Sequence, residues 1–236
     1  MSFSIILPSR NHASLQACVA SIRASGQWEQ IIVVDDGLKS REIRGAGHLM
    51  FLDGIKPFIF SRACNQGIKA ARSRIDVTTH SSGEPVFVDG PAEDVILLND
   101  DAMLEIPGGF TALAQCATAH PEYGIIASTC NNVGNPNQHQ RAVGLRYEPR
   151  MVCFVCVFIP RATLNTVGLL DEDYTAYGSE DDDYCYRVRK AGLRIGIFDG
   201  CFVNHARLHS TFRGDHGCSI APGIEIFRRK HGGYPL

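Results

Sequence analysis

The chain has 236 residues, 44% of them hydrophobic and 20% charged, which suits one ordinary domain or two small ones. Its 23 Lys and Arg against 25 Asp and Glu leave a net charge of −2, so we expect no nucleic-acid binding, which needs a basic surplus. The hydrophobic fraction excludes a disordered chain. No apolar run reaches the roughly 18 residues that span a bilayer, and the opening residues lack a secretory pattern. We therefore expect a cytoplasmic protein without integral membrane contact.

Nine cysteines are scattered without a regular spacing. In a chain without an export signal, the expectation is reduced thiols that pack as small hydrophobic groups. A zinc site formed by Cys153, Cys156, His205 and His209 is the alternative, but the separation of about 50 residues between the two pairs does not match a compact zinc finger. The segment MVCFVCVFI also predicts a continuous buried strand, in which Cys153 and Cys156 would face opposite sides.

The first elements form a strand–helix–strand unit. A strand over Ser4–Leu7 (SIIL) stops at Pro8, and a second over Ile31–Val34 (IIVV) is wholly apolar, as in the middle of a parallel sheet. Between them a helix follows Asn11 and ends near Gly26, and its apolar residues recur at helical spacing: Leu15, Cys18, Val19 and Ile22. Such a unit is a right-handed βαβ crossover.

The same alternation continues along the chain. We expect a strand at Leu49–Leu52, a helix at Ser61–Ser73, a strand at Val95–Leu98, a helix at Gly109–Ala119 and a strand at Ile125–Ser128. Two segments interrupt it. Ile75–Glu93 predicts a surface hairpin, and the Asn-, Gly- and Pro-rich stretch Asn131–Arg141 predicts a loop that could close over a ligand as a lid.

The second half is less regular. It predicts a strand at Val152–Ile159, a helix opening near Pro160, a helix from Glu180 to Ala191, and an amphipathic end helix around Ile224–Lys230 with a solvated basic face. The fold class we predict is α/β, a single domain with a Rossmann-like mixed sheet flanked by helices.

Polar residues follow three of the expected strands. They are Pro8-Ser9-Arg10-Asn11, Asp35-Asp36-Gly37 and Asn99-Asp100-Asp101, and ligands of open α/β sheets bind at such strand ends. No glycine-rich phosphate motif occurs, so a metal or a basic cluster would have to hold any phosphates. Asn99-Asp100-Asp101 has the oxygen ligands of a hard cation such as Mg²⁺ or Mn²⁺; the alternative is a solvated turn or helix cap.

A second acidic cluster has seven acids in thirteen residues, from Asp171 to Asp183. Its last four, Glu180 to Asp183, begin a helix, where acids meet the helix dipole favourably. Four consecutive acids also repel one another, which favours a site over simple capping. Arg187 is placed to pair with Asp183 across one turn.

His205 follows another expected strand end. A lone histidine is more often structural than a ligand, but this one precedes a basic stretch with Arg207, His209 and Arg213 that could face an anionic ligand.

In this order the residues resemble the family 2 glycosyltransferases, inverting enzymes of the GT-A fold that use nucleotide-sugar donors. The resemblance runs from about residue 3 to 211. SIILPSRN followed by IIVVDDG is similar to the family's opening, which implies that Asp36 contacts the nucleoside and places Pro8, Ser9 and Arg10 at the donor. Ser61–Gly67 resembles the A-R-N-x-G segment, with Asn65 and Gly67 matching.

Asn99-Asp100-Asp101 is similar to the family's D-x-D motif, with Asn in place of the first acid. The match implies that Asn99 and Asp100 lie at the donor and that Asp101 contacts the metal directly. VGLLDE over 167–172 and YGSEDDD over 177–183, with Arg187 and Gly192, resemble the V-G-x-x-D-E and E-D-x-D…R…G motifs; the second is also similar to β1,4-galactosyltransferases.

By this resemblance Asp181 is the catalytic base, Glu180 orients the acceptor hydroxyl, and His205 binds the metal. The implied reaction moves a hexose from a UDP-, GDP- or dTDP-linked donor to a saccharide or other hydroxyl acceptor by direct displacement, with Mn²⁺ or Mg²⁺ as cofactor. We expect the helix N-terminus to keep Asp181 ionised. The nucleotide-binding half would span 3–98, the acceptor half 106–212 and a C-terminal tail 213–236.

Two other functions stay open at this stage. A metal-dependent nucleotidyltransferase acting on a sugar phosphate would also hold a nucleotide at the strand ends, but it ordinarily needs a glycine- and lysine-rich loop after the first strand. A catalytically silent binding module would have no use for the acids beside a metal site.

Overall fold

The structure is a computed structural model, and it describes residues 2–47, 49–71, 93–175, 178–205 and 220–233. Of the segment predicted as a surface hairpin, only Glu93 is among the described residues. Cys218 and the basic residues Arg207, His209 and Arg213 also lie outside the described residues.

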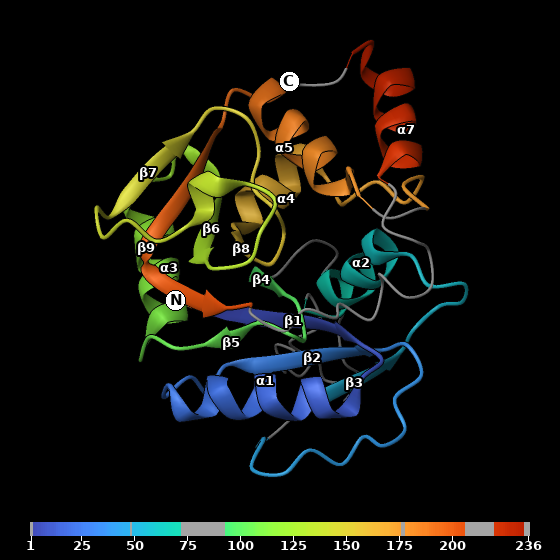
Figure 1. Ribbon diagram of the computed structural model, residues 1–236, viewed down its shortest axis with the longest axis vertical. Coiled ribbons are helices and arrows are strands. Elements are labelled where there is room, and N and C mark those ends of the chain that lie inside the picture. Colours follow the sequence, from blue (N-terminus) through green and yellow to red (C-terminus); the bar gives the residue numbers. More distant parts are fainter. Residues whose placement is uncertain (1, 48, 72–92, 176–177, 206–219, 234–236) are drawn as a thin grey trace, which may run out of the picture.

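The described strands form one mixed sheet (Figure 1). They are β1 (Phe3–Ser9), β2 (Gln30–Asp35), β3 (Leu49–Asp53), β4 (Asp94–Leu98), β5 (Met103–Leu104), β6 (Tyr123–Cys130), β7 (Leu145–Glu148), β8 (Cys156–Ile159) and β9 (Arg194–Asn204). Their order is β3-β2-β1-β4-β8-β6-β9-β5, and β7 pairs with β9 beside this path. Strands β1 to β4 are mutually parallel, β8 is antiparallel to β4 and to β6, and β9 is parallel to β6.

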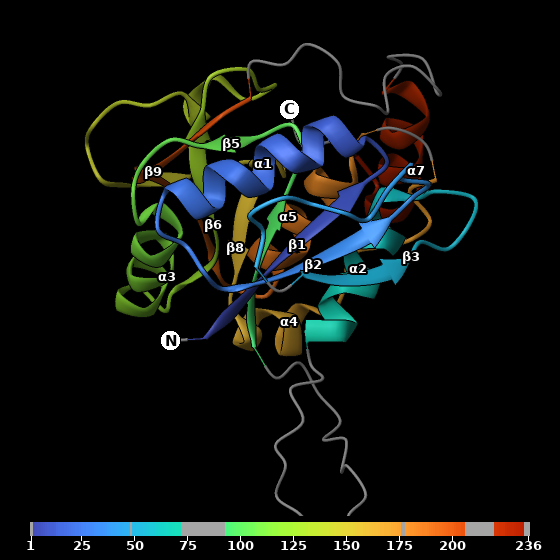
Figure 2. The same ribbon diagram turned by 90° about the horizontal axis from the view of Figure 1, so that it is seen from below.

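The described helices flank this sheet. They are α1 (His12–Ala24), α2 (Phe60–Ala71), α3 (Gly109–Ala119), α4 (Arg161–Val167), α5 (Glu180–Lys190) and α7 (Ala221–His231), with a 3-10 turn at Pro136–Gln138. Figure 1 shows α1 and α2 on opposite sides of the β1–β2 layer, and Figure 2 shows α1 crossing in front of the sheet. In the part of the chain that the structure describes, no helix has the length and apolar character needed to cross a membrane.

The apolar residues of the central strands contribute to two hydrophobic cores, one on each face of the sheet. Successive strand residues point to opposite faces, so Ile5 packs with α1 and α3 in one core while Ile6 packs with α2, α4 and α5 in the other. Ile31 and Ile32 divide in the same way. This explains why the runs SIIL and IIVV contain no polar alternation, and the predicted α/β fold with a mixed sheet between helices is confirmed.

Strand direction brings five strand ends to one edge of the sheet. β1, β2 and β4 are parallel, and β6 runs the same way because β8 is antiparallel to both β4 and β6. β9, which is parallel to β6, also ends there. The residues that follow these strands therefore share the sheet edge where ligands of α/β folds bind.

The predicted strand over Val152–Ile159 is wrong in its first half, because the strand begins only at Cys156. The Gln138 side chain accepts a hydrogen bond from the Cys153 N–H (2.6 Å) and donates one to the Cys153 carbonyl (3.1 Å). The Val155 carbonyl accepts from the N–H of Asn99 (2.9 Å). These partners replace a neighbouring strand, so the segment turns across the sheet edge instead of extending the strand.

The loop expected to act as a lid is fastened to the body of the protein. Asn135 donates to the carbonyl of Met151 (2.7 Å), and Gln138 is fully buried. Asn137 donates to Glu148 of β7 (2.9 Å), a strand that the sequence analysis missed, like β5. Such bonding does not fit a lid that swings freely.

Asp199 organises the far end of this loop. Its buried carboxylate accepts hydrogen bonds from the N–H groups of Arg141 (3.0 Å) and Val143 (3.1 Å) and from the guanidinium of Arg146 (3.0 Å). Burial alone would raise the pKa of Asp199, but the hydrogen bonds from Arg146 and the two backbone groups outweigh it, and the pKa is lowered.

We predict that Asp199→Asn lowers the free energy of unfolding by about 1.5–3 kcal/mol near neutral pH, because a buried, charge-assisted hydrogen-bond set is lost. A carboxylate whose pKa is lower in the folded state stabilises fully above its unfolded pKa, and this contribution disappears as the pH falls through the folded value. Urea denaturation across that range, with the exposed Glu122→Gln as control, should show the deficit shrinking in acid. An equal deficit at every pH would contradict the assignment.

Candidate functional site

Ser9 and Asp100 join the ends of β1 and β4. The Ser9 hydroxyl donates to the Asp100 carboxylate at 2.5 Å, and both side chains are buried. Burial raises the pKa of Asp100 to about 6; the Ser9 hydrogen bond lowers it, and the neighbouring charge of Asp101 raises it again. Pro8 lies in β1 opposite Val34 of β2, and Asn99 opens the turn that carries the two acids.

Asp101 lies against His205 at the end of β9, which links two segments 104 residues apart along the chain. His205 Nε2 is 3.1 Å from Asp101 Oδ1, and His205 Nδ1 donates to the carbonyl of Asn132 (2.6 Å). A carbonyl oxygen can only accept, so Nδ1 carries the proton. Nε2 then either carries a second proton, as an ion pair with Asp101, or presents its lone pair to a cation.

The residues present fit a divalent cation in two respects. The Oδ2 atom of Asp101 is buried, and among the described residues it has no hydrogen-bond partner. The 3.1 Å between His205 and Asp101 is close to the separation of about 3 Å between adjacent ligands of an octahedral cation. Within the described ranges no group of three or more His, Cys, Asp or Glu side chains is arranged for a metal, so these two residues would form an open site.

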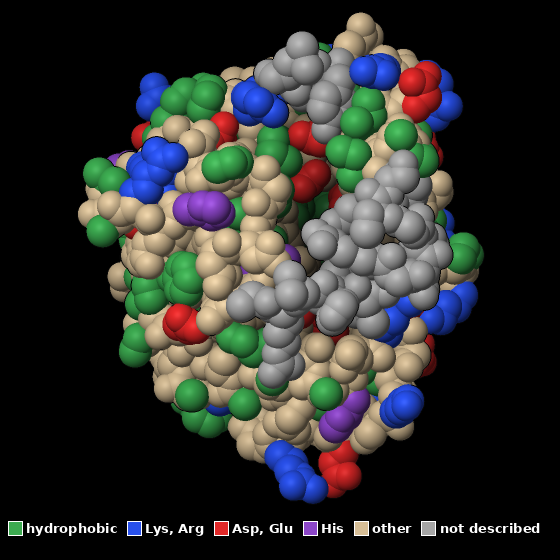
Figure 3. Space-filling model, viewed as in Figure 1, with side chains coloured by type: hydrophobic (Ala, Val, Ile, Leu, Met, Phe, Trp, Pro, Cys, Tyr) green, Lys and Arg blue, Asp and Glu red, His purple; other side chains and the backbone are tan. Residues whose placement is uncertain are grey.

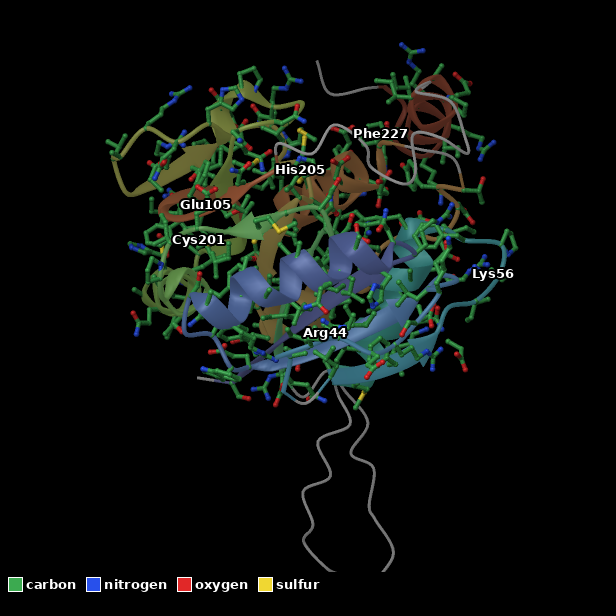
Figure 4. All side chains as sticks on the ribbon, turned by 60° about the horizontal axis from the view of Figure 1, so that its bottom comes forward. Arg44, Lys56, Glu105, Cys201, His205 and Phe227 are labelled. Atoms are coloured by element: carbon green, nitrogen blue, oxygen red, sulfur yellow. The ribbon has the colours of Figure 1, made fainter. Side chains whose placement is uncertain are left out.

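The polar loop Asn131–Asn132 sets the position of His205. The Asn131 side chain accepts from the N–H of His205 (2.8 Å) and donates to Asn204 (3.0 Å), which donates in turn to Glu105 (2.6 Å). In Figure 4, His205 lies between Cys201 of β9 and Phe227 of α7. Sequence reasoning found His205 but not these asparagines, because a polar loop has no pattern that tells which histidine it binds.

Asp36, after β2, is held by two cations. Its side chain is only 2% exposed, and Arg10 contacts one carboxylate oxygen at 2.7 Å while Lys56 contacts the other. The Arg10 guanidinium lies over the ring of Phe58, 5.5 Å from its centroid. Sequence reasoning missed Lys56 and Phe58. This group of charged and aromatic side chains adjoins the Ser9–Asp100 pair through Arg10.

The side-chain amide of Asn65 in α2 both donates and accepts hydrogen bonds, all with residues 170–172. It donates to the carbonyl of Leu170 (2.9 Å) and to Glu172 (3.0 Å), and it accepts from the N–H of Leu170 (3.0 Å). Arg62 of the same helix pairs with Glu172 (3.1 Å). The contact of Asn65 with a donor stays a prediction; its described partners tie α2 to the segment before α5.

The acidic cluster of residues 171–183 divides into groups with different partners. Lys230 of α7 pairs with Asp171 and Asp173, whereas Glu172 contacts Arg62 and Asn65 of α2. Asp183, 1% exposed, pairs with Arg187 (2.8 Å) and His231 (2.7 Å). The predicted Asp183–Arg187 pair is confirmed. The basic residues of the predicted end helix, Arg228, Arg229 and Lys230, are exposed, and Lys230 in addition pairs with two of these acids.

Glu180 and Asp181 are the acids at the very start of α5. Burial, together with the charge of Asp182, raises the pKa of Glu180, and its Oε2 atom is buried without a hydrogen-bond partner among the described residues. Burial followed by the charges of Glu180 and Asp182 raises the pKa of Asp181 well above its usual value. The helix N-terminus, expected to keep Asp181 ionised, does not hold this pKa low, because burial and the two neighbouring acids exceed the effect of the helix dipole.

Asp181 and Asp101 each influence a different thiol. The charge of Asp181 contributes to the raised pKa of the Cys153 thiol, and that of Asp101 contributes to the raised pKa of the Cys18 thiol; burial is the larger cause in both. The Cys156 thiol of β8 contributes to the raised pKa of both the Cys18 thiol and the Cys130 thiol, again after burial. All eight described cysteines are free thiols. Figure 3 shows a hollow on this face of the molecule with acidic side chains on its wall.

We predict that Asn65→Ala lowers the free energy of unfolding by about 1–3 kcal/mol, because it leaves the buried backbone groups of Leu170 without partners. Urea denaturation measures this loss. Gln66→Ala on the same helix is the matched control, since its hydrogen bonds to Ile55 and Asp53 are exposed and should contribute less than about 0.5 kcal/mol. A stable Asn65→Ala variant that loses nucleotide binding instead would favour the donor contact.

No protein-family model matches the chain. The uncharacterized protein y4gI of Sinorhizobium fredii is 25% identical over 216 residues, which cover 80% of this chain and 23% of that protein. The chain therefore spans less than a quarter of the length of this curated relative.

Solved structures resemble the chain over almost its whole length. The crystal structure of GalNAc-T7 with UDP, GalNAc and Mn²⁺ has a TM-score of 0.69 at 11% identity and covers 97% of this chain and 48% of its own. S. aureus TarS has a TM-score of 0.59 at 14% identity (97% and 42% covered), and its fragment 1–349 has 0.54 at 13% (98% and 74%). At these identities the likeness concerns the fold alone, and it confirms that the chain has the GT-A fold.

Proposed function

We propose that this chain is a metal-dependent glycosyltransferase that moves a hexose from a nucleoside-diphosphate sugar to a hydroxyl acceptor with inversion. The observation that carries the proposal is the Asp101–His205 pair just after the carboxyl ends of β4 and β9, where one buried carboxylate oxygen of Asp101 has no hydrogen-bond partner among the described residues. The likeness to GalNAc-T7, solved with UDP, GalNAc and Mn²⁺, supports this choice of chemistry. We place the chain with the family 2 enzymes and in the cytoplasm on its sequence alone.

The donor would bind in the half formed by residues 3–98. Asp36 recognises the nucleoside, and Arg10 and Lys56, which now neutralise Asp36, supply positive charge for the diphosphate. Ser9, Asn99 and Asp100 line the strand ends next to it, and Pro8 and Asn65 support this half from β1 and α2. The nucleotide could be UDP, GDP or dTDP.

Asp101 and His205 would hold Mn²⁺ or Mg²⁺ through the carboxylate of Asp101 and the Nε2 atom of His205. When bound, such a cation acts as a Lewis acid that stabilises the negative charge on a leaving diphosphate. The backbone carbonyl of Asn132 keeps the His205 ring in the orientation and protonation state that a ligand needs.

Asp181 would take the acceptor's proton. As the acceptor oxygen forms its bond to the anomeric carbon, the bond from that carbon to the diphosphate oxygen breaks and the hydroxyl proton passes to Asp181, which inverts the anomeric centre. The raised pKa of Asp181 gives its ionised form a high proton affinity, which suits a base that acts on a hydroxyl. Glu180 orients this hydroxyl. The acceptor half would span 106–212 and the tail 213–236, within a single domain of 1–236.

We predict that Asp181→Asn reduces transfer at least 100-fold, in keeping with the usual contribution of a general base, and leaves the dissociation constant for the nucleoside diphosphate unchanged. Product analysis with UDP-, GDP- and dTDP-sugars and Mn²⁺ measures the rate, with Glu122→Gln as control. Full activity in Asp181→Asn would refute the base. Release of nucleoside monophosphate or pyrophosphate by the unchanged protein would instead indicate a nucleotidyltransferase.

We predict that Asp101→Asn and His205→Gln each weaken Mn²⁺ binding at least tenfold, since either change removes one of two protein ligands. The electron paramagnetic resonance signal of free Mn²⁺ measures binding without turnover. Chelation with EDTA should stop transfer, and added Mn²⁺ should restore it. An unchanged affinity in both variants would exclude this pair as the cation site.

A further inference from the structure

We propose that helix α7 is a positioning element that sets the place of Glu180 and Asp181, and that Gly223 is the residue through which it does so. This inference rests on the proposed function. Gly223 of α7 lies directly against the carbonyl of Gly178, two residues before Glu180. Figure 1 shows α7 beside the segment that leads into α5.

The contact is closer than any residue with a side chain would allow. A Cβ atom at position 223 would lie 2.1 Å from the Gly178 oxygen, 2.9 Å from its carbonyl carbon and 3.2 Å from Ser179 Cβ. On the other side of the contact, a Cβ at position 178 would lie 2.9 Å from a methyl group of Ile220. Two glycines therefore let the helix backbone rest on the loop backbone.

The loop under this contact has a strained residue. Ser179 has a φ of 72°, in the left-handed region, and precedes α5 as its N-cap without a capping hydrogen bond from its side chain. A non-glycine residue in this region costs about 1–2 kcal/mol, so it persists only where its surroundings hold it. Its carbonyl accepts from the N–H of Asp183 (3.0 Å) and thereby starts the helix. The direction in which Glu180 and Asp181 leave the loop follows from this conformation.

Polar contacts hold α7 on both sides of the same loop. Lys230 pairs with Asp171 and Asp173 before it, and His231 pairs with Asp183 after it. Phe227 is 1% exposed and packs edge-on against Tyr186 of α5, with 5.7 Å between ring centroids. The helix is thus fixed relative to α5, and Gly223 transmits that position to Gly178 and Ser179.

The test compares Gly223→Ala with Gly233→Ala, whose Cβ would meet nothing within 4 Å. A new methyl group at position 223 must displace the Gly178–Ser179 backbone, and a displacement of about 1 Å at reacting groups costs on the order of 100-fold in rate. We expect kcat for transfer to fall about 10- to 100-fold in Gly223→Ala, with the dissociation constants for nucleoside diphosphate and Mn²⁺ unchanged. Gly233→Ala should match the unchanged protein.

Hydrogen exchange of the amides of residues 178–183 gives a readout that does not depend on turnover. We expect faster exchange there in Gly223→Ala and no change in β1 and β2. If Gly223→Ala does not fold, Lys230→Met with the exposed Arg229→Met as control loosens the same helix without a clash, and should lower kcat several-fold. Unchanged kcat and unchanged exchange would overturn the positioning role. Changed exchange in a protein that transfers no sugar would refute the proposed function and leave the positioning of this loop standing.

Discussion

The structure depends above all on how it compensates buried negative charge. A carboxylate removed from water is costly unless a cation or several hydrogen bonds accompany it. Asp36 has Arg10 and Lys56, Asp199 has Arg146, and Asp183 has Arg187 and His231. In each case the partner comes from another element or from the next turn, so charge compensation also fixes how loops and helices lie against the sheet.

The acids of the candidate site are compensated less completely. Asp100, Glu180 and Asp181 have raised pKa values because burial and neighbouring acids exceed the compensation they receive. Asp101 has a histidine on one oxygen and no described partner on the other. Stability alone would favour replacing such groups by apolar ones. Their concentration at the strand ends is what a site needs if a cation and a proton are to complete it.

Local patterns were enough to predict most of the fold. The wholly apolar run IIVV indicates a strand that is buried on both faces. The helical spacing of Leu15, Cys18 and Val19 indicates a helix that is buried along one face. The first half of the predicted strand over Val152–Ile159 was wrong for the opposite reason. Its apolar sequence allows a strand, but the side chain of Gln138 binds the backbone of Cys153. A contact between residues 15 positions apart cannot be recognised from the local sequence pattern.

The sequence likewise identified some residues of the candidate site but not the partners of others. The resemblance to the family 2 glycosyltransferases implies that Asp101 and His205 share a metal, and the structure brings the two side chains together because both follow strands that run in the same direction. Lys56, Lys230 and His231 could not be identified as partners of Asp36, Asp171 and Asp183. In a sequence, a basic side chain exposed to solvent cannot be told from one that pairs with an acid of another segment. The difference depends on which segments the fold places side by side.

The four consecutive acids of α5 show how helix geometry limits such a cluster. Successive residues of an α-helix are about 100° apart around its axis, so Asp181 and Asp183 point about 200° apart and cannot serve one site. Because Asp183 turns toward His231 of α7 and toward Arg187, Asp181 lies on the opposite side of the same helical turn. One turn of α5 therefore carries both the proposed base and a contact with α7, so a shift of this turn would change both.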